Sequence, residues 1–232
     1  MKTIVIILAS GIGSRLGLEI PKQFLEIQGK TVLERSIKVF NSNDNIDEII
    51  VVSHPDYILK TQEIVNKGGY KKVVKIIEGG STRQESSLNG LSSISEVDAK
   101  VLIHDAVRPF VTDRIINDCI ESLKKYDAVN VAIESSDTII EIDDDNCIKN
   151  IPQRRLLKRV QTPQGFNLKI IKKAHQLAMQ KKDLFFTDDC GLVQEFKLAK
   201  IKIVNGDENN IKITYPSDIK LAENIIDVCD KI

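Results

Sequence analysis

The sequence predicts an α/β fold with a doubly wound, mostly parallel sheet and a projecting β-arm. The first observation is an alternation of short apolar runs, rich in Val and Ile, with amphipathic stretches, which is typical of parallel strands joined by helices. The second is a single break in this alternation, where two strand-like runs follow each other without a helix. Ligands bind at the carboxyl ends of strands in such sheets, so functional residues are expected directly after strands.

The apolar runs have the length and the Val and Ile content of buried strands. They are Thr3–Leu8, Glu48–Ser53, Lys72–Ile77, Lys100–His104, Ala128–Ile133 and Lys200–Val204. The amphipathic stretches predict helices, and several of them begin after Ser, Thr, Asp or Pro. They are Thr31–Phe40, Tyr57–Asn66, Arg83–Ile94, Asp113–Lys124, Leu168–Met179 and Ser217–Asp230.

The break in the alternation predicts a β-hairpin. Its strands are Asp137–Ile142 and Cys147–Ile151, and Asp143–Asn146 joins them. Such an arm, at about residues 135–156, would project from the sheet with open edges and apolar side chains, and a symmetric homodimer is a natural way to cover them. The chain has no repeat or linker, so a single domain over residues 1–232 with this arm is expected.

The composition excludes several function classes. The 232 residues include 33 Lys and Arg and 33 Asp and Glu, so the formal net charge is zero. An overall charge therefore does not favour binding to nucleic acid or to a membrane. The apolar start, Thr3–Leu8, is too short for a membrane span or a signal-peptide core, and a cytoplasmic protein is expected. No Cys-x-x-Cys pair, Gly-x-Ser-x-Gly or catalytic cysteine pattern occurs, which disfavours a zinc site and hydrolytic or thiol chemistry.

A glycine-rich loop, Leu8–Gly17, follows the first predicted strand and is a candidate phosphate-binding loop. It is not the dinucleotide-binding fingerprint, because Leu16 stands where that motif needs glycine, and no Gly-Lys-Ser/Thr follows as in a P-loop. The loop instead offers backbone N–H donors and two permanent cations, Arg15 and Lys22, which could flank a triphosphate. The alternative is a tight turn with solvated cations.

Two further clusters follow strands. Glu78–Ser86 combines two glycines, hydroxyls and a cation at the start of a helix, so it would share one crevice with the first loop. In Ile103–Phe110, Asp105 could hold Mg²⁺ or a ribose hydroxyl and Arg108 a phosphate. A strand-end Asp without other groups is more often a helix cap.

Polar segments later in the chain could grip a second, phosphorylated substrate. Ser136–Thr138 opens the predicted arm, Arg154–Arg155 closes it, and Gln161–Phe166 precedes the next helix. Asn209–Thr214 places Lys212 in a short predicted strand between apolar neighbours. A solvated strand face is the alternative for Lys212.

Taken together, these segments closely resemble the family of CTP-dependent polyol-phosphate cytidylyltransferases, which includes the 2-C-methyl-D-erythritol 4-phosphate and the ribitol 5-phosphate enzymes. The resemblance spans essentially the whole chain. It implies a Rossmann-like nucleotidyltransferase domain whose β-arm is exchanged in a homodimer. The segments that carry it are LASGIGSRLG with PKQF, GGSTRQESS, HDAVRPF, SDT, QTPQGF, TDD at Thr187–Asp189, and NIKIT.

The resemblance implies a single displacement in which a phosphate oxygen of the polyol phosphate attacks the α-phosphorus of CTP, giving a CDP-polyol and pyrophosphate. By similarity Arg15 and Lys22 stabilise the transition state, and Arg154 and Lys212 hold the polyol phosphate. Asp105 is the expected Mg²⁺ contact. The residues implied for CTP are Leu8, Ala9, Ser10, Gly11, Gly13, Gly80, Ser81, Thr82, Arg83, Ser86 and Asp105, and those implied for the polyol phosphate are Arg108, Thr138, Arg154, Thr162 and Lys212, with Asp105.

Departures from the family pattern bear on the acceptor. The erythritol-phosphate branch usually has Lys where this arm has Ile140, and HDAVRPFVTDRII and AIESSDTIIE look more like the ribitol-phosphate branch. TDDCGLVQE looks more like the erythritol-phosphate branch. We therefore expect ribitol 5-phosphate, with 2-C-methyl-D-erythritol 4-phosphate as the alternative. Ser10 replaces the Gly or Ala usual in the first loop, where a small side chain still lets a phosphate approach the backbone.

Two other functions compete with this one. A nucleotidyltransferase that uses a sugar 1-phosphate and another nucleotide would share the glycine-arginine-lysine loop, but QTPQGF and the arm argue against it. A nucleotide-binding module without turnover would have lost at least one cation, whereas the chain retains all four, namely Arg15, Lys22, Arg154 and Lys212.

Overall fold

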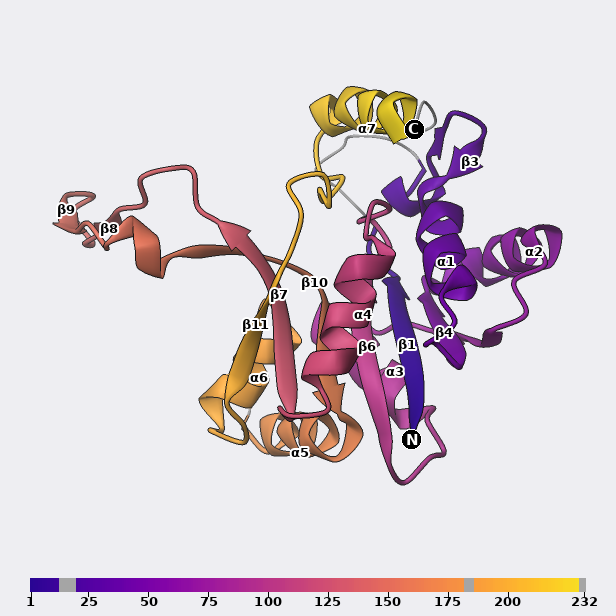
Figure 1. Ribbon diagram of the computed structural model, residues 1–232, viewed down its shortest axis with the longest axis horizontal. Coiled ribbons are helices and arrows are strands. Elements are labelled where there is room, and N and C mark those ends of the chain that lie inside the picture. The colour runs from indigo at the N-terminus through magenta and orange to yellow at the C-terminus, as the bar shows by residue number, and fades with distance from the viewer. Residues whose placement is uncertain (13–19, 182–185, 230–232) are drawn as a thin grey trace.

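A seven-stranded sheet forms the centre of the protein in the computed structural model, which describes residues 1–12, 20–181 and 186–229 (Figure 1). One strand, β10, runs antiparallel to its neighbours β6 and β7, and the other six are parallel to one another. The strand order is β11-β7-β10-β6-β1-β4-β5, with bounds β1 (Lys2–Ala9), β4 (Glu48–Ser53), β5 (Val73–Glu78), β6 (Ala99–Asp105), β7 (Ala128–Glu134), β10 (Lys158–Asn167) and β11 (Ile201–Asn205).

Helices cover both faces of this sheet, which confirms the doubly wound α/β fold. Side chains alternate along β1, so that Val5 and Ile7 enter the core on one face and Ile4 and Ile6 the core on the other. The first core is closed by α1 (Val32–Ser42), α2 (Ile58–Gly68) and α4 (Asp113–Ser122), and the second by α3 (Arg83–Ser92), α5 (Leu168–Met179) and α6 (Asp189–Glu195).

The C-terminal helix α7 (Pro216–Cys229) lies apart from both cores. Its Ala222 and Ile226 pack with Ile27, Val107 and Ile213 in a third apolar cluster. The remaining described elements are short: β2 (Glu26–Ile27), β3 (Lys30–Thr31), β8 (Glu141–Ile142), β9 (Ile148–Asn150), and the 3₁₀ turns η2 (Lys22–Phe24), η3 (Pro55–Tyr57) and η4 (Arg154–Leu156). Among the helices of the described residues, none combines the length and apolar character needed to cross a bilayer.

The sequence analysis missed one strand and expected another that is not there, and both cases concern polar segments. Gln161–Phe166 precedes the helix α5, as expected, but it also belongs to β10 at the middle of the sheet, where the register shifts between Val160 and Gln164. This strand was not predicted because its two glutamines interrupt the apolar pattern, and because proline, here Pro163, is rarely found in a central strand. Asn209–Thr214 is not a strand, although Ile213 is fully buried.

The projecting arm is present as a hairpin of β8 and β9. It extends well away from the sheet (Figure 1). The first strand is shorter than expected, because only Glu141–Ile142 of Asp137–Ile142 pairs with β9. Ile142 and Ile148 face each other across the hairpin and are 53% and 60% exposed, so a single chain leaves the apolar side chains of the arm open to water.

Candidate active site

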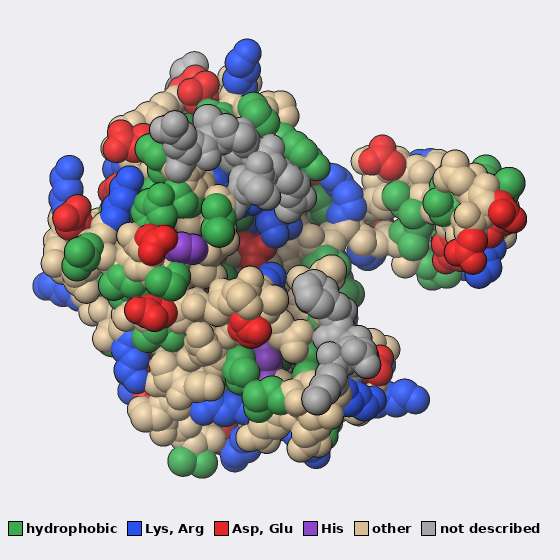
Figure 2. Space-filling model, turned by 180° about the vertical axis from the view of Figure 1, so that it is seen from behind, with side chains coloured by type: hydrophobic (Ala, Val, Ile, Leu, Met, Phe, Trp, Pro, Cys, Tyr) green, Lys and Arg blue, Asp and Glu red, His purple; other side chains and the backbone are tan. Residues whose placement is uncertain are grey.

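A cavity of about 500 Å³ lies among the described residues at the carboxyl ends of β1 and β6. Figure 2 views the molecule from behind and shows acidic and basic side chains together in a hollow near the centre of that side. The two predicted loops and the strand-end carboxylate therefore do share one crevice. The cavity is lined by Leu8, Ala9, Ser10, Gly11, Ile12, Lys22, Gln23, His54, Gly80, Ser81, Thr82, Arg83, Asp105, Val107 and Lys212.

The first loop supplies Ser10, Gly11 and the cation Lys22. Lys22 begins the 3₁₀ turn η2 and is only 9% exposed, so it is not the solvated cation of the alternative interpretation. The neighbouring Gln23 donates from Nε2 to the Ala9 carbonyl oxygen at 2.6 Å, which ties this turn to the end of β1. Gly13 and Arg15 lie outside the described residues.

The second loop meets the first through a pair of hydroxyls. The Oγ atoms of Ser10 and Ser86 are 2.7 Å apart, and Ser86 Oγ also accepts from the Gly80 N–H at 3.1 Å. A Cβ atom at Gly79 would lie 2.3 Å from Ser10 Cβ, so only glycine permits this close approach. Thr82 begins α3 by accepting from the Glu85 N–H, leaving the N–H groups of the first turn near the cavity.

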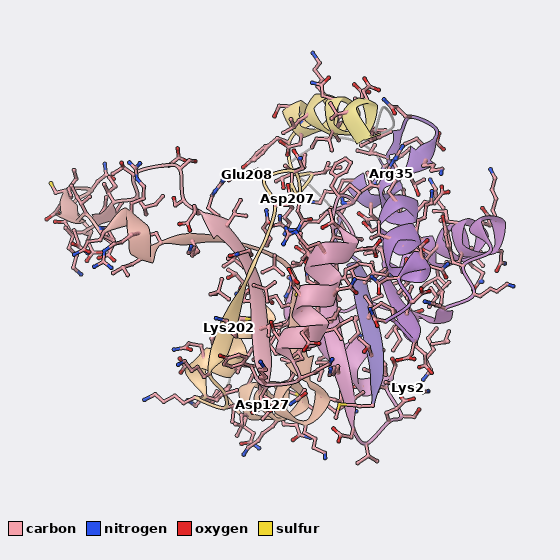
Figure 3. All side chains as sticks on the ribbon, in the orientation of Figure 1. Lys2, Arg35, Asp127, Lys202, Asp207 and Glu208 are labelled. Carbon is pink, nitrogen blue, oxygen red and sulfur yellow. The ribbon has the colours of Figure 1, made fainter. Side chains whose placement is uncertain are left out.

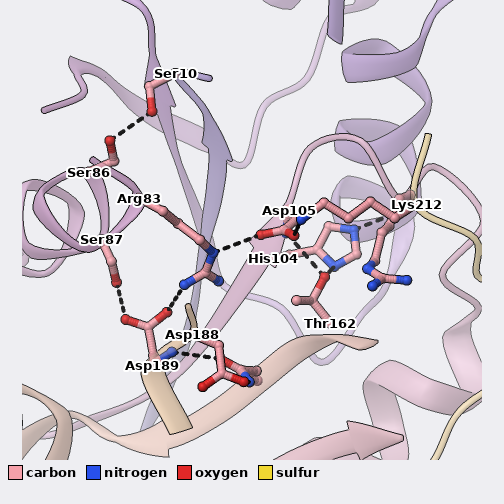
Figure 4. A network of polar contacts seen from close by, with 12 residues as sticks. Ser10, Arg83, Ser86, Ser87, His104, Asp105, Thr162, Asp188, Asp189 and Lys212 are labelled. Atoms are coloured by element: carbon pink, nitrogen blue, oxygen red, sulfur yellow. Dashed lines mark hydrogen bonds and ion pairs between the residues drawn. The ribbon is translucent and has the colours of Figure 1, made fainter. Parts of the chain in front are cut away.

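Asp105 is the central carboxylate, and two cations hold it (Figure 4). Its Oδ2 lies 2.7 Å from Lys212 Nζ, and its Oδ1 lies 3.2 Å from Arg83 Nε. Burial opposes ionisation of Asp105, but the charges of Arg83 and Lys212 outweigh it and hold the pKa of the carboxyl well below its usual range. Lys212 is therefore not on a solvated strand face, and Asp105 is not a helix cap.

The segment that carries Lys212 is anchored to β10. Gln161 donates from Nε2 to the Asp207 carbonyl oxygen at 2.8 Å, and Arg159 forms an ion pair with Glu208 at 2.6 Å. Figure 3 shows Asp207 and Glu208 beside each other where this segment leaves the sheet. These contacts explain how a segment without strand pairing still places Lys212 against Asp105.

The residues that line the cavity could hold Mg²⁺ only together with a bound nucleotide. Among the described residues, Asp105 is the one carboxylate lining the cavity, and no group of three His, Cys, Asp or Glu side chains could hold a metal. Mg²⁺ commonly takes one or two protein carboxylates and completes its oxygen shell with substrate phosphates and water. Asp105 could therefore contribute one ligand to a Mg²⁺–triphosphate chelate.

Thr162 and Arg108 do not line the cavity but form a polar layer next to Asp105. Thr162 Oγ1 accepts from the Asp105 N–H at 3.1 Å and lies 3.0 Å from His104 Nδ1. Arg108 donates from Nη1 to the Asn210 carbonyl oxygen at 2.8 Å and from Nη2 to that of Val160 at 3.3 Å. The structure thus places both predicted residues at the edge of the site.

His104 makes the stability of the fold dependent on pH. Burial lowers its pKa to about 4, so protons bind the unfolded chain first as the pH falls below about 6.5. Stability present above pH 6.5 is then lost as the pH falls toward 4, and we expect about 2 kcal/mol of that loss between pH 7 and pH 5. Urea unfolding of wild type and His104→Gln at both pH values tests this: the variant should lose less stability, and equal losses would contradict it.

The arm residues Thr138 and Arg154 are together but away from the cavity of their own chain. Arg154 donates from Nη2 to Thr138 Oγ1 at 2.9 Å, and neither residue lines the cavity. Figure 1 shows the arm directed away from the ends of β1 and β6. Within one chain, then, the structure does not bring these predicted residues to Lys212 and Asp105.

Sequence reasoning missed several residues at or behind the cavity. His54 lines it, and its only signal was its position directly after a predicted strand. Asp189 lies behind it, 2.7 Å from Arg83 Nη1, and was marked only by the Thr187–Asp189 segment of the resemblance. A buried carboxylate that pairs with an arginine 106 residues earlier leaves no local pattern in the sequence.

Comparisons with known proteins agree with this geometry. The family model for 2-C-methyl-D-erythritol 4-phosphate cytidylyltransferase matches residues 3–228. The enzyme of that name from Thermobifida fusca is 40% identical over 227 residues, which cover 95% of this chain and 91% of that protein. The bifunctional ribulose 5-phosphate reductase/CDP-ribitol pyrophosphorylase of Haemophilus influenzae is 42% identical over 97% of this chain, which spans 48% of that protein.

A solved structure shows the same architecture over the whole chain. The 4-diphosphocytidyl-2C-methyl-D-erythritol synthase of Anaerococcus prevotii superposes with a TM-score of 0.87 at 32% identity, covering 97% of this chain and 96% of that one. The 2-C-methyl-D-erythritol 4-phosphate cytidylyltransferase of Thermus thermophilus superposes with a TM-score of 0.76 at 30% identity.

Proposed function

The chain belongs to the 2-C-methyl-D-erythritol 4-phosphate cytidylyltransferase family and is a CTP-dependent nucleotidyltransferase, and we propose that its acceptor is 2-C-methyl-D-erythritol 4-phosphate. The full-length match to that family carries this proposal. It reverses the expectation from the arm, which favoured ribitol 5-phosphate. The reason for the reversal is that a family match over residues 3–228 outweighs the single departure at Ile140 of the arm.

The cavity can position two anions that repel each other. We place the triphosphate of CTP against the loops of Ser10–Gly11 and Gly80–Thr82, where backbone N–H groups and the start of α3 favour negative charge. A phosphate oxygen of the acceptor then attacks the α-phosphorus, and the bond to the pyrophosphate oxygen breaks. Preorganised cations stabilise the charge that develops on the transferring group, and Lys22 is the described residue placed to do so.

Asp105 and Lys212 would hold the acceptor side of the site. Lys212 is 36% exposed at its side chain while paired to Asp105, so its ammonium can also reach a phosphate in the cavity. When bound, Mg²⁺ would neutralise charge on the phosphates, with Asp105 as its protein ligand.

The arm completes the site in our proposal through a homodimer. The family resemblance assigns Arg154 and Thr138 to the acceptor phosphate, yet in one chain they lie away from the cavity. An arm that crosses to a second copy would bring them to that copy's cavity and cover its exposed isoleucines. Residues 1–232 would then form one domain whose site draws on two copies of the chain.

The acceptor is tested by pyrophosphate release from CTP and Mg²⁺ with 2-C-methyl-D-erythritol 4-phosphate or ribitol 5-phosphate. We expect kcat/KM for the erythritol phosphate to exceed that for ribitol 5-phosphate by about a hundredfold or more, since each buried polar group left unpaired by the wrong acceptor costs on the order of 1–3 kcal/mol. Equal release without any acceptor, measured as a control, would indicate CTP hydrolysis instead.

Ribitol 5-phosphate is the second candidate, because of the 42% identity to the CDP-ribitol pyrophosphorylase and the missing arm lysine. A preference for it in the same assay would overturn the proposed acceptor but not the cytidylyl transfer. An Ile140→Lys variant then asks whether the arm sets the choice: its preference should move toward the erythritol phosphate.

A further inference from the structure

Asp189 lies behind the cavity and none of the roles above uses it. It begins α6 and is 1% exposed. Its carboxylate accepts from Arg83 Nη1 at 2.7 Å, from Ser87 Oγ at 2.6 Å and from His175 Nε2 at 3.0 Å (Figure 4). Burial alone would raise the pKa of Asp189, but Arg83 and then His175 and Ser87 outweigh it and lower the pKa to about 2. The group is therefore a permanent anion.

Arg83 is held on two sides by carboxylates. Its Nε faces Asp105 Oδ1 at 3.2 Å, in the cavity, and its Nη1 faces Asp189 Oδ2 at 2.7 Å, behind it. The guanidinium is planar and rigid, so two fixed contacts also fix its third nitrogen. That nitrogen, Nη2, is buried and has no hydrogen-bond partner among the described residues.

Arg83 lines the cavity that we assign to CTP and its side chain is 25% exposed, so a bound nucleotide would meet the positive charge of this fixed guanidinium. If the charge on Asp189 were removed, Asp105 would be the one carboxylate among the described residues left in contact with Arg83, and the guanidinium would lose its second anchor.

We propose that Asp189 is a positioning residue for nucleotide binding, which fixes the guanidinium of Arg83 in the wall of the cavity where its charge favours the bound CTP. Ser87 and His175 hold the carboxylate of Asp189 in turn, and Gln164 Oε1 accepts from the Asp189 N–H at 3.0 Å. The inference rests on the proposed placement of CTP in this cavity.

The test compares Asp189→Asn with Asp188→Asn, its neighbour in the chain. Asp188 caps α6 by accepting from the Gly191 N–H and, among the described residues, forms no hydrogen bond or ion pair with Arg83, so its variant controls for damage to the helix start. CTP binding is measured by calorimetry without an acceptor, and CTP and acceptor KM by steady-state kinetics. Asp189→Asn should weaken CTP binding about 10- to 100-fold and leave the acceptor KM within about threefold, and Asp188→Asn should bind CTP as wild type does.

A double-mutant cycle separates positioning from a purely structural role. If Asp189 acts through Arg83, adding Asp189→Asn to Arg83→Gln should change CTP affinity by less than about twofold. A loss as large as in the wild-type background, or unchanged CTP binding in folded Asp189→Asn, would overturn the inference. If one of these outcomes is found while the wild-type protein binds CTP and transfers cytidylyl groups normally, the proposed function stands and only the role of Asp189 is refuted. If the wild-type protein does not bind CTP, the placement of CTP in this cavity is itself refuted.

Discussion

Lys22→Ala is expected to lower kcat about a hundredfold or more while the protein stays folded. Lys22 is a buried cation on the wall of the cavity, at the start of the turn that follows the glycine-rich loop. A cation aimed at a transferring phosphoryl group acts mainly on the transition state, and losing one such group typically costs about 2–4 kcal/mol in the barrier. The loss should therefore fall on kcat rather than on the KM for the acceptor.

A second lysine provides the matched control. Lys60 Nζ lies 5.3 Å from the ring centroid of Phe24, in the same 3₁₀ turn as Lys22, but Lys60 does not line the cavity. Lys60→Ala therefore tests whether disturbance of the turn is enough to impair turnover. We expect it to retain activity within about twofold, with both variants melting within a few degrees of wild type. Near-wild-type turnover of Lys22→Ala would remove this residue from the mechanism.

The sequence was sufficient for those parts of the fold that follow from side-chain periodicity. The buried parallel strands and most helices were predictable because each one places apolar residues at its own period, as Ile4–Ile7 of β1 and Leu33, Ile37 and Phe40 of α1 do. The loops around Ser10 and Gly80 were predictable for the same reason: the position of a strand end also fixes the position of the loop that follows.

The parts that escaped prediction depend on polar contacts between distant residues. The central strand β10 is held by its ladders to β6 and β7 although its sequence includes Gln161, Pro163 and Gln164. The partner of Lys212 is 107 residues earlier in the chain, at Asp105. Because neither contact repeats along the chain, periodicity could not reveal it: the composition marked these segments only as candidate polar segments, and the family resemblance assigned them to the site.

Arg154→Ala is expected to reduce kcat/KM for the acceptor about a hundredfold and to leave CTP affinity unchanged. The reason is that Arg154 would contact only the acceptor phosphate, and would do so in the cavity of the other copy. Calorimetry with CTP and kinetics with varied acceptor separate these two quantities. A variant with weakened CTP binding and normal acceptor KM would contradict the assignment.

Mixing variants tests whether the arm crosses between copies. In a heterodimer of Lys22→Ala and Arg154→Ala chains, one site would carry both substitutions and the other neither, if each cavity receives Arg154 from the partner. With random exchange half of the dimers are mixed, so about a quarter of all sites, and about a quarter of wild-type activity, should return. Lys22→Ala mixed with Lys212→Ala is the control, because both residues line the same chain's cavity and no intact site can form. Recovery in the first mixture alone requires cross-chain donation, whereas no recovery despite verified subunit exchange would mean that the arm serves the cavity of its own chain.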